Sequence, residues 1–451
     1  MYEPVLSIDF GASYTKVAHR TVCKPAPRHP YDSRAKPVIL DQSLLIPSLA
    51  IHTKKSRSPW LFGRQAAELT PDGNMEVFQN WKASLFHAQN NKDSAAAVIV
   101  AEQFFRWLKD KLEAAGIDVQ KVHTRVAMPA FKTFDEQALL IARCMELAGW
   151  DSPRILKATE PHANVLGLFS EGRNFASQTR QGEILLNYGK MFGMHSTYVR
   201  HARGSIFGTH DHLLSVAVVD IGAFTTDIAS MMFDFNADDM GDGLRYLRQE
   251  SHVLGVINDL DRPVFSVLKS LHGMNWSEVS FKETEIVKQS LYHGKPYSLL
   301  VKGRGTINLG DKQDHEAVKS QAAKFADCLW EKVSDFIKPQ KPTKVYLTGG
   351  GGLIPALAEP LAKHLQAKGI IVAPLTYDGN TEQDLQRMAT ALGGASLILQ
   401  APGLRNDPED GMPRRLPKIP DPLPDAHVSC HCQGGNKDCC FCAGRGYYKR
   451  Q

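Results

Sequence analysis

The stretch Asp220-Ile221-Gly222-Ala223-Phe224-Thr225-Thr226-Asp227 decides the fold that this sequence predicts. It follows an apolar run, 215–219, of the kind that forms a buried strand. A carboxylate ends the run, a glycine opens the turn, and two hydroxyls and a second carboxylate follow. Glycine lets backbone N–H groups approach phosphate oxygens, and a carboxylate can hold the water shell of Mg²⁺. The stretch therefore predicts a phosphate-binding turn.

The same pattern occurs near the start of the chain, as Ser7-Ile8-Asp9-Phe10-Gly11-Ala12-Ser13-Tyr14-Thr15-Lys16. One Asp-x-Gly turn is common in any fold, but two that each follow an apolar strand rarely arise by chance. A third turn, Gly349-Gly350-Gly351-Gly352, follows the strand-like run 344–347. Helical periodicity separates these units, at 96–114, 134–148, 283–292, 315–337 and 381–399. The alternation predicts an α/β fold with two related lobes and a nucleotide between them.

Composition sets the limits of this interpretation. The chain has 451 residues, with 53 Lys and Arg against 48 Asp and Glu, a net charge of +5. Hydrophobic residues make up 43% and charged residues 22%, values typical of globular proteins. The length suits about two to four structural units with a sizeable core. A disordered, fibrous or small disulfide-stapled protein is excluded.

Membrane and export signals are not evident in the sequence. The apolar runs 95–101 and 213–219 are shorter than the roughly 20 residues that span a bilayer. The first residues, MYEPVLSID, lack the basic and long apolar regions of a secretory signal. We expect a cytoplasmic protein that does not cross a membrane.

Together, these motifs resemble the actin and DnaK superfamily of ATPases. TRVAMPAF at 124–131, the helix 134–150 and ATEPHAN at 158–164 are similar to its first connecting segment. VYLTGGGGLIP at 345–355 resembles the adenosine motif, and MATALGGA at 388–395 resembles the second connecting helix. Each piece is weak alone, but the ordered set is specific.

Within the superfamily, the nucleotide-binding domain of DnaK-type chaperones, the heat-shock protein 70 family, is the closest match. IPSLA at 46–50, FGRQAA at 62–67 and FQNWK at 78–82 carry this likeness. The resemblance implies a two-lobed actin-like ATPase fold over residues 1–400, with duplicated mixed-sheet domains and nucleotide in the central cleft. Lobe I would cover about 1–167 and 376–400, and lobe II about 214–375.

The resemblance also implies roles for individual residues. Asp9 and Asp220 would orient Mg²⁺ through its waters, and Glu160 would accept the proton of the attacking water. Lys82 would neutralise charge on the transferred phosphoryl group, Thr225 would contact the γ-phosphate, and Asp227 would help to hold the metal or its waters. ATP or ADP would be bound by Gly11, Ala12, Ser13, Tyr14, Lys16, Gly222, Ala223, Phe224, Thr226, Gly349, Gly350 and Gly351, with Glu285 and Lys288 at the ribose or adenine.

Structural interpretations remain open beside these roles. Lys82 could be an ordinary solvated lysine, and Glu160 could simply open a helix, where the dipole favours an acid. Glu285 and Lys288 could form an i, i+3 surface ion pair. Ala12, the pair Ala223-Phe224 and Gln289 depart from the DnaK pattern, and predict weaker nucleotide affinity or a different base preference.

Two regions fall outside the ATPase pattern. Residues 168–213 form an insertion with a basic character, which we interpret as a solvated or partner-binding loop in preference to a nucleic-acid site. Residues 401–428 are rich in proline and predict an extended linker.

The end of the chain carries a cysteine cluster over 429–451. Cys430, Cys432, Cys439 and Cys442 have the paired spacing of a structural Zn²⁺ site, with Cys440, His427 or His431 as alternative ligands. The segment is similar to half of the zinc domain of DnaJ-type cochaperones, whose first pair is spaced C-x-x-C where this chain has C-x-C. We expect a zinc knuckle.

Three functions follow from the resemblance. The first is a DnaK-like ATPase switch that lacks the peptide-binding domain and acts with a protein partner through the zinc tail or the insertion. The second is an actin-like protein that forms nucleotide-dependent filaments, which the Thr225-Thr226-Asp227 sequence favours. A sugar or metabolite kinase ranks last, because no carboxylate base for a substrate hydroxyl is evident. The partner and the oligomeric state stay open.

Overall fold

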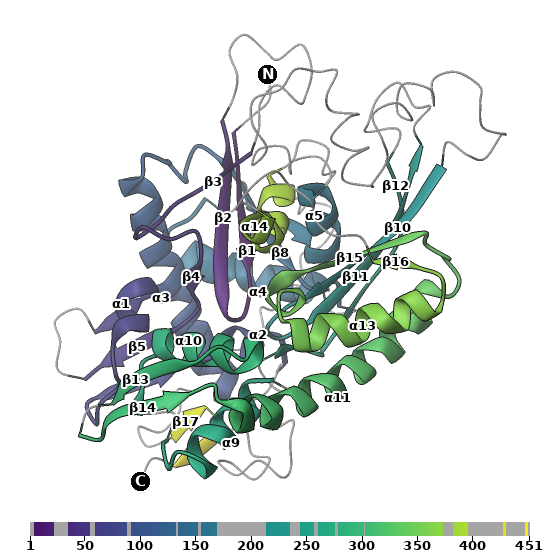
Figure 1. Cartoon of the computed structure of the whole chain (residues 1–451). Helices are drawn as coiled ribbons and strands as arrows, with labels where there is room; N and C mark the ends of the chain where they lie inside the picture. The colour runs from purple at the N-terminus through teal and green to yellow at the C-terminus, as the bar shows by residue number, and fades with distance from the viewer. Residues whose placement is uncertain are drawn as a thin grey trace.

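The structure is a computed structural model of the chain (Figure 1). It describes residues 4–21, 35–54, 59–87, 92–131, 134–151, 155–168, 213–234, 244–256, 260–275, 278–301, 303–372, 382–395, 427–429 and 447–449. The expected insertion, apart from its first and last residues, lies outside this part of the chain. So do the proline-rich linker up to residue 426 and all the cysteines of the tail.

The first large sheet holds the first predicted turn. Its strands lie in the order β3-β2-β1-β8-β9, and β4 pairs with β2. The central strand β1 runs antiparallel to β2 and parallel to β8, and all its residues are buried. The bounds are β1 Val5–Phe10, β2 Tyr14–Arg20, β3 Lys36–Pro37, β4 Ile46–Pro47, β8 His123–Met128 and β9 Ile155–Thr159.

The second large sheet repeats this arrangement. Its order is β12-β11-β10-β15-β16, and its central strand β10 runs antiparallel to β11 and parallel to β15. The bounds are β10 Leu213–Ile221, β11 Thr226–Asp234, β12 Leu244–His252, β15 Lys344–Thr348 and β16 Ile371–Val372. In both sheets, a hairpin of the first two strands is followed by two parallel strands. The structure thus confirms an α/β fold with mixed sheets.

Helices and a small sheet surround the first large sheet. They are α1 Gly63–Glu68, α2 Trp81–His87, α3 Lys92–Ala114 and α4 Phe134–Leu147, with β5 Ala50–Thr53, β6 Trp60–Phe62 and β7 Met75–Phe78. Ile8 of β1 belongs to the same buried cluster as Phe104 of α3 and Met145 of α4. The rings of Phe10 and Phe105 stack with their centroids 5.1 Å apart. This aromatic packing fixes β1, and with it the turn that follows.

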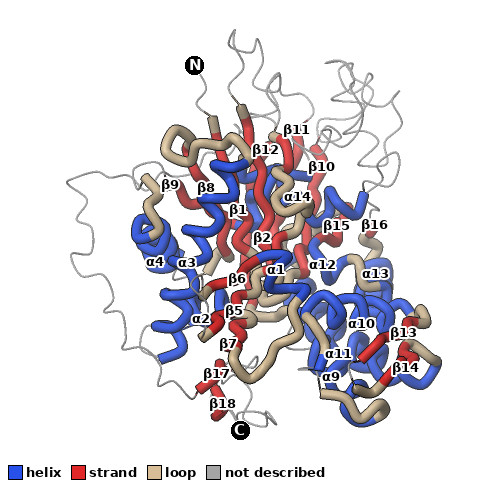
Figure 2. The backbone as a smooth tube through the Cα atoms, turned by 90° about the vertical axis from the view of Figure 1, so that its left-hand side faces the viewer, coloured by secondary structure: helices blue, strands red, loops and turns tan. Residues whose placement is uncertain are grey.

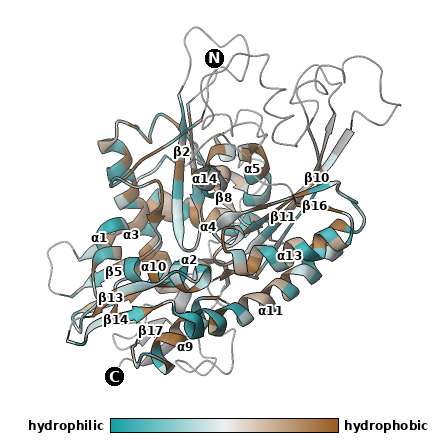
Figure 3. Ribbon diagram, viewed as in Figure 1, coloured by the Kyte–Doolittle hydropathy of each residue, from teal (hydrophilic) through white to brown (hydrophobic). Residues whose placement is uncertain are grey.

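The second sheet has its own core. Val219 of β10, Phe325 of α11 and Leu361 of α13 belong to one buried cluster. The elements around it are α9 Arg262–Ser270, α10 Phe281–His293, β13 Tyr297–Val301, β14 Gly305–Leu309, α11 Lys312–Ile337, α12 Gly349–Gly352 and α13 Pro355–Ala367. Helices α11 and α13 show patches of hydrophilic and hydrophobic residues, as amphipathic helices do (Figure 3).

Two helices join the halves. α5 (Glu160–Leu166) follows the last strand of the first sheet, and α14 (Glu382–Gly394) packs against it. A Cβ atom at Gly167 would lie 1.7 Å from the carbonyl oxygen of Ala389, and one at Gly393 would lie 1.7 Å from that of Ala163. The two backbones meet this closely because both positions are glycine. Figure 2 shows α14 between strands of both sheets.

Most predicted elements are found with small shifts at their ends. For the predicted helix 381–399, α14 ends at Gly394, the second of two consecutive glycines, which are poor helix formers; residues 396–399 lie outside the described residues. The described helices include none with both the length and the apolar character that a membrane span needs. Near the end of the chain, β17 (His427–Ser429) pairs antiparallel with β18 (Tyr447–Lys449).

Candidate functional site

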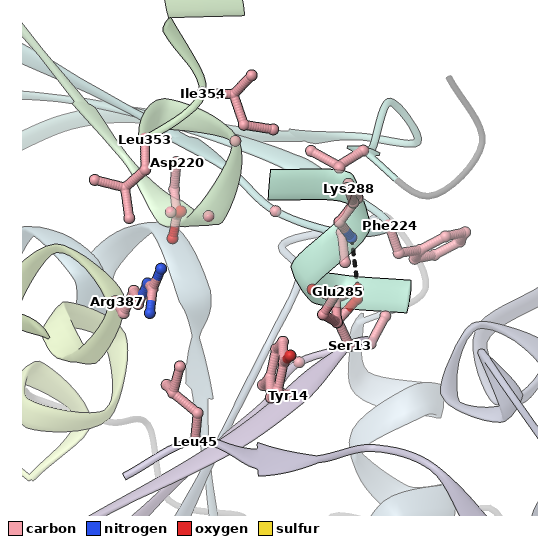
Figure 4. Close-up of a pocket in the computed structure, with 18 of the residues that line it drawn as sticks. Ser13, Tyr14, Leu45, Asp220, Phe224, Glu285, Lys288, Leu353, Ile354 and Arg387 are labelled. Atoms are coloured by element: carbon pink, nitrogen blue, oxygen red, sulfur yellow. Dashed lines mark hydrogen bonds and ion pairs between the residues drawn. The ribbon is translucent and has the colours of Figure 1, made fainter. Parts of the chain in front are cut away.

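A cavity of about 520 Å³ lies where the two predicted turns meet (Figure 4). Its walls come from both large sheets and from α5, α10, α12 and α14. The predicted residues that line it are Asp9, Gly11, Ala12, Ser13, Tyr14, Lys16, Lys82, Glu160, Asp220, Gly222, Ala223, Phe224, Thr225, Asp227, Glu285, Lys288, Gly349, Gly350 and Gly351. The structure therefore brings together residues that lie hundreds of positions apart.

Thr226 is the predicted residue of this site that does not line the cavity. Its side chain is buried, and its Oγ1 donates to the carbonyl oxygen of Leu254 at 2.9 Å. Side chains alternate between the faces of a strand, so Thr225 and Asp227 share one face and Thr226 takes the other. The Thr226 side chain therefore points away from the cavity, and its predicted contact with the nucleotide is not supported by this placement.

The first turn is shaped by the β1–β2 hairpin. Asp9 and Lys16 are register partners, and their side chains form an ion pair of 2.7 Å. A Cβ atom at Gly11 would lie 2.6 Å from the carbonyl oxygen of Tyr14, so the turn needs glycine there. The Ser48 hydroxyl donates to the Gly11 carbonyl at 2.9 Å and holds the turn from outside the hairpin. Ser48 is not among the site residues predicted from the sequence.

The second turn has the same construction. Asp220 and Asp227 are register partners, and the Gly222 N–H donates to the Thr225 carbonyl at 2.9 Å. The Thr225 hydroxyl donates to Asp227 at 3.0 Å, and the Ser251 hydroxyl of β12 also donates to Asp227. Thr225 therefore orients Asp227 in this structure, in addition to facing the cavity.

Asn164 joins the pieces of the site and was missed by the sequence analysis. Its Nδ2 donates to Asp220 at 2.7 Å and to the Thr390 hydroxyl of α14 at 3.1 Å. Its Oδ1 accepts from the Thr348 hydroxyl of β15 at 3.3 Å. Asn164 lies one helical turn after Glu160 on α5, which is the spacing that places both on one face. The four-residue spacing from Glu160 was the feature of the sequence that could have predicted Asn164 as a site residue.

Four carboxyl groups converge at one end of the cavity. Burial, followed by the charge of Asp227, raises the pKa of Asp220 to about 7. Burial also raises the pKa of Asp227 to about 6 and that of Glu160 well above its usual value, with Asp227 the next contributor for Glu160. Asp9 adds to the repulsion in each case. Crowded buried acids of this kind are stabilised in their charged form by a cation.

This group of acids suits a divalent cation that keeps part of its water shell. Within the described residues, no three His, Cys, Asp or Glu side chains are placed to hold a metal ion directly. Mg²⁺ keeps several of its waters and binds through one or two carboxylates plus substrate phosphates. Asp9 and Asp220 match that mode, because both line the cavity at the ends of the two central strands.

Lys82 is fully buried, so the alternative of a solvated lysine is wrong. Its Nζ lies 3.9 Å from the centroid of the Phe10 ring and 4.9 Å from that of Phe104. The ammonium group also donates to the Thr15 hydroxyl. Burial lowers the pKa of Lys82 well below its usual value, although Asp9 acts in the opposite direction. The aromatic rings and one hydroxyl thus hold this lysine at the cavity wall.

Glu285 and Lys288 form the expected i, i+3 ion pair, at 2.6 Å, but it is not a surface pair. Lys288 is buried and also pairs with Asp261 at 3.0 Å. Burial opposes the charge on Lys288, but Asp261 and Glu285 outweigh burial and raise its pKa. The Tyr14 hydroxyl bonds to Glu285 from the other half of the molecule. Figure 4 shows the pair on α10 above Tyr14.

The glycine turn closes the site next to Asp220. Gly349 has a φ of +76°, and a Cβ atom there would lie 2.2 Å from Asp220 Oδ1. A Cβ atom at Gly351 would lie 2.4 Å from Ile221 Cγ2, whereas one at Gly350 would meet nothing within 4 Å. Gly349 and Gly351 are therefore needed for close packing, and Gly350 leaves open space.

The predicted zinc ligands Cys430, Cys432, Cys439 and Cys442 lie outside the described residues, as do the alternatives Cys440 and His431. The structure does place the ends of this segment together. Ser429 pairs with Tyr447, and His427 pairs with Lys449. The two short strands therefore bracket residues 430–446.

Comparison with known proteins adds no assignment. No known protein family matches this chain, and no curated protein is significantly similar to it in sequence.

Proposed function

We propose that this protein binds ATP with Mg²⁺ in the cavity and hydrolyses it slowly, as a DnaK-like molecular switch with a two-lobed actin-like ATPase fold. The single observation that carries the proposal is the duplicated site. In two sheets of the same strand order, the next-to-last residue of the central strand is an aspartate, Asp9 or Asp220, and both aspartates line one shared cavity. The glycine turns beside both aspartates suit close approach by phosphate groups.

Asp9 and Asp220 would hold Mg²⁺ through its waters, and the cation would neutralise charge on the phosphates and align the transferred group. The raised pKa of Asp220 supports this role, because a divalent cation offsets the repulsion that the acids exert on one another. Asn164 holds Asp220 through a hydrogen bond of 2.7 Å, and so fixes the direction in which the carboxylate points.

Glu160 would orient the attacking water and accept its proton. It opens α5 and faces the cavity, so it both starts the helix and reaches the reaction site. Burial and the neighbouring acids raise the pKa of Glu160, which makes it a stronger proton acceptor than an ordinary glutamate, as suits a general base. Asp227 is hydrogen-bonded to Glu160 and would keep it in place.

Lys82 would stabilise charge on the transferred phosphoryl group at the wall formed by Phe10. Glu285 and Lys288 would contact the ribose or adenine at the other end of the cavity. We propose that the protein acts in the cytoplasm with a protein partner. The insertion at 168–213 or the zinc-bearing tail would bind this partner.

The test is a single-turnover ATPase assay with purified full-length protein. Wild-type protein is expected to bind ATP and release phosphate only when Mg²⁺ is present. Glu160→Gln should bind ATP with a Kd within about threefold of wild type and hydrolyse it about 100-fold more slowly. Glu136→Gln, an exposed acid in the first turn of α4, is the matched control and should behave like wild type. Wild-type protein without Mg²⁺-dependent turnover would overturn the proposal.

A further inference from the structure

The cations that line the cavity differ in whether a carboxylate is paired with them. Lys16 is paired with Asp9 at 2.7 Å, and Lys288 is paired with both Glu285 and Asp261. Lys82 is enclosed by aromatic rings. Lys16 and Lys288 are therefore already matched by carboxylates, and Lys82 is the cation assigned above to the transferred phosphoryl group. A polyanionic ligand needs a cation that is not already matched by a carboxylate.

Arg387 meets this need and has no role so far. It lines the cavity from α14, three residues before Thr390, whose hydroxyl donates to Asp220 at 3.4 Å. Residues three apart lie on one helix face, so Arg387 and Thr390 both face the site. Figure 4 shows the guanidinium in the cavity between Asp220 and Tyr14. It is also close enough to Tyr14 to act electrostatically on its hydroxyl.

Among the residues that the structure describes, no carboxylate forms an ion pair with Arg387. The remaining lysine of the lining, Lys295, is exposed at the end of α10 and faces water. Arg387 is only partly exposed. A guanidinium in such a place offers up to five N–H donors in a fixed geometry that suits phosphate oxygens.

We propose that Arg387 binds the phosphates next to the ribose, and so selects nucleoside di- and triphosphates over nucleosides. This inference rests on the proposed function. The position follows from the two ends of the cavity: the acids that would hold the metal lie at one end, Glu285 and Lys288 lie at the other, and Arg387 lies between Asp220 and Tyr14 (Figure 4). The sequence did not mark Arg387, because it lies one residue before the motif 388–395 that carries the resemblance.

The test is calorimetric titration of full-length protein with ATP, ADP and adenosine, each in excess Mg²⁺. Arg387→Gln should raise the Kd for ATP and ADP by about 10- to 100-fold, the usual effect of losing hydrogen bonds to a charged group. The Kd for adenosine should stay within about twofold. Arg106→Gln, which removes a surface partner of Glu102 on α3, is the matched control and should change none of the three.

Each outcome decides the question. An unchanged ATP affinity in Arg387→Gln, with wild-type protein that binds ATP, would overturn this inference and leave the proposed function in place. An equal loss of affinity for adenosine and for ATP in Arg387→Gln would also overturn this inference. Wild-type protein that binds no nucleotide would overturn both. If Arg387→Gln does not fold, Arg387→Lys keeps the charge without the planar donor geometry. Arg387→Lys should raise the Kd for ATP and ADP several-fold and leave the Kd for adenosine unchanged.

Discussion

The carboxyl groups of Asp220 and Asp227 oppose each other on the hairpin that forms the second turn. Burial raises the pKa of Asp220 to about 7 and that of Asp227 to about 6, while an unfolded aspartate titrates near about 4. Between these values the folded protein keeps protons that the unfolded chain has released. The free energy of unfolding must therefore fall as the pH rises through this window. A bound cation would offset the repulsion between the charged acids.

This predicts that metal-free protein is less stable at about pH 8 than at about pH 5, by more than about 1 kcal/mol from these acids. Asp220→Asn should reduce that pH dependence, because the amide does not titrate. Urea denaturation in EDTA at both pH values measures it. Asp110→Asn, an exposed acid on α3, should keep the wild-type difference. An Asp220→Asn variant with the same pH dependence as wild type would contradict the assigned cause.

A substitution at Lys82 can separate effects on stability from effects on ATP hydrolysis. Methionine has a similar length and can occupy the space between Phe10 and Phe104 without a charge. Lys82→Met should keep the free energy of unfolding within about 1 kcal/mol, or raise it, because no charge is then buried. ATP hydrolysis should fall by about 100-fold or more. Urea denaturation and single-turnover hydrolysis measure the two effects. Full hydrolysis by Lys82→Met would remove Lys82 from the mechanism.

At the scale of elements, the crossing of α5 and α14 sets the geometry of the site. Asn164 and Thr390 reach Asp220 from these two helices. Gly393→Ala would place a Cβ atom 1.7 Å from a backbone oxygen, which cannot move aside as a side chain does. We expect a loss of about 3 kcal/mol in the free energy of unfolding. The same change at Gly73, which has open space around it, should cost less than about 1 kcal/mol. Equal stabilities of the two variants in urea would contradict this account.

The sequence predicted these elements better than the contacts between them. Periodicity and glycine turns located the central strands β1, β10 and β15, because such signals are local. The face that Thr226 takes depends on the register of β11, and the role of Asn164 depends on a helix more than 200 residues away in the chain. Likewise, the burial of Lys82 arises from α3, which follows it. Local patterns contain no record of such long-range packing.

At the scale of the whole molecule, the chain joins the cavity, for which we propose ATP as the ligand, to a cysteine-rich tail. The pairing of β17 with β18 brings the two ends of 430–446 together, which suits a closed structural metal site. We predict one zinc ion per chain by elemental analysis. Cys430→Ser with Cys442→Ser should abolish zinc binding, whereas Cys328→Ser, an exposed cysteine on α11, should leave it unchanged. Zinc retained by the double variant would contradict the proposed ligands.

The two candidate functions, a DnaK-like switch and an actin-like filament, differ in whether the subunits polymerise. A filament needs a large head-to-tail interface between two different faces of neighbouring subunits, usually with an apolar centre. Among the described residues, the three most exposed large apolar side chains are Ile39 just after β3, Leu300 on β13 and Ile371 on β16, and these strands lie apart in Figure 1. A tail on every subunit would also have to fit between neighbours. These features favour a switch that does not polymerise.

High-speed sedimentation tests that choice directly. Full-length protein is spun with ATP and Mg²⁺, with ADP and Mg²⁺, and without nucleotide, and the pelleted fraction is measured. We expect the protein to stay in the supernatant in all three samples. Glu160→Gln, which should hold ATP without hydrolysing it, makes the test stricter, because a filament that hydrolysis disassembles would accumulate in this variant. Pelleting that requires ATP, in wild type or in Glu160→Gln, would favour the actin-like filament over the switch.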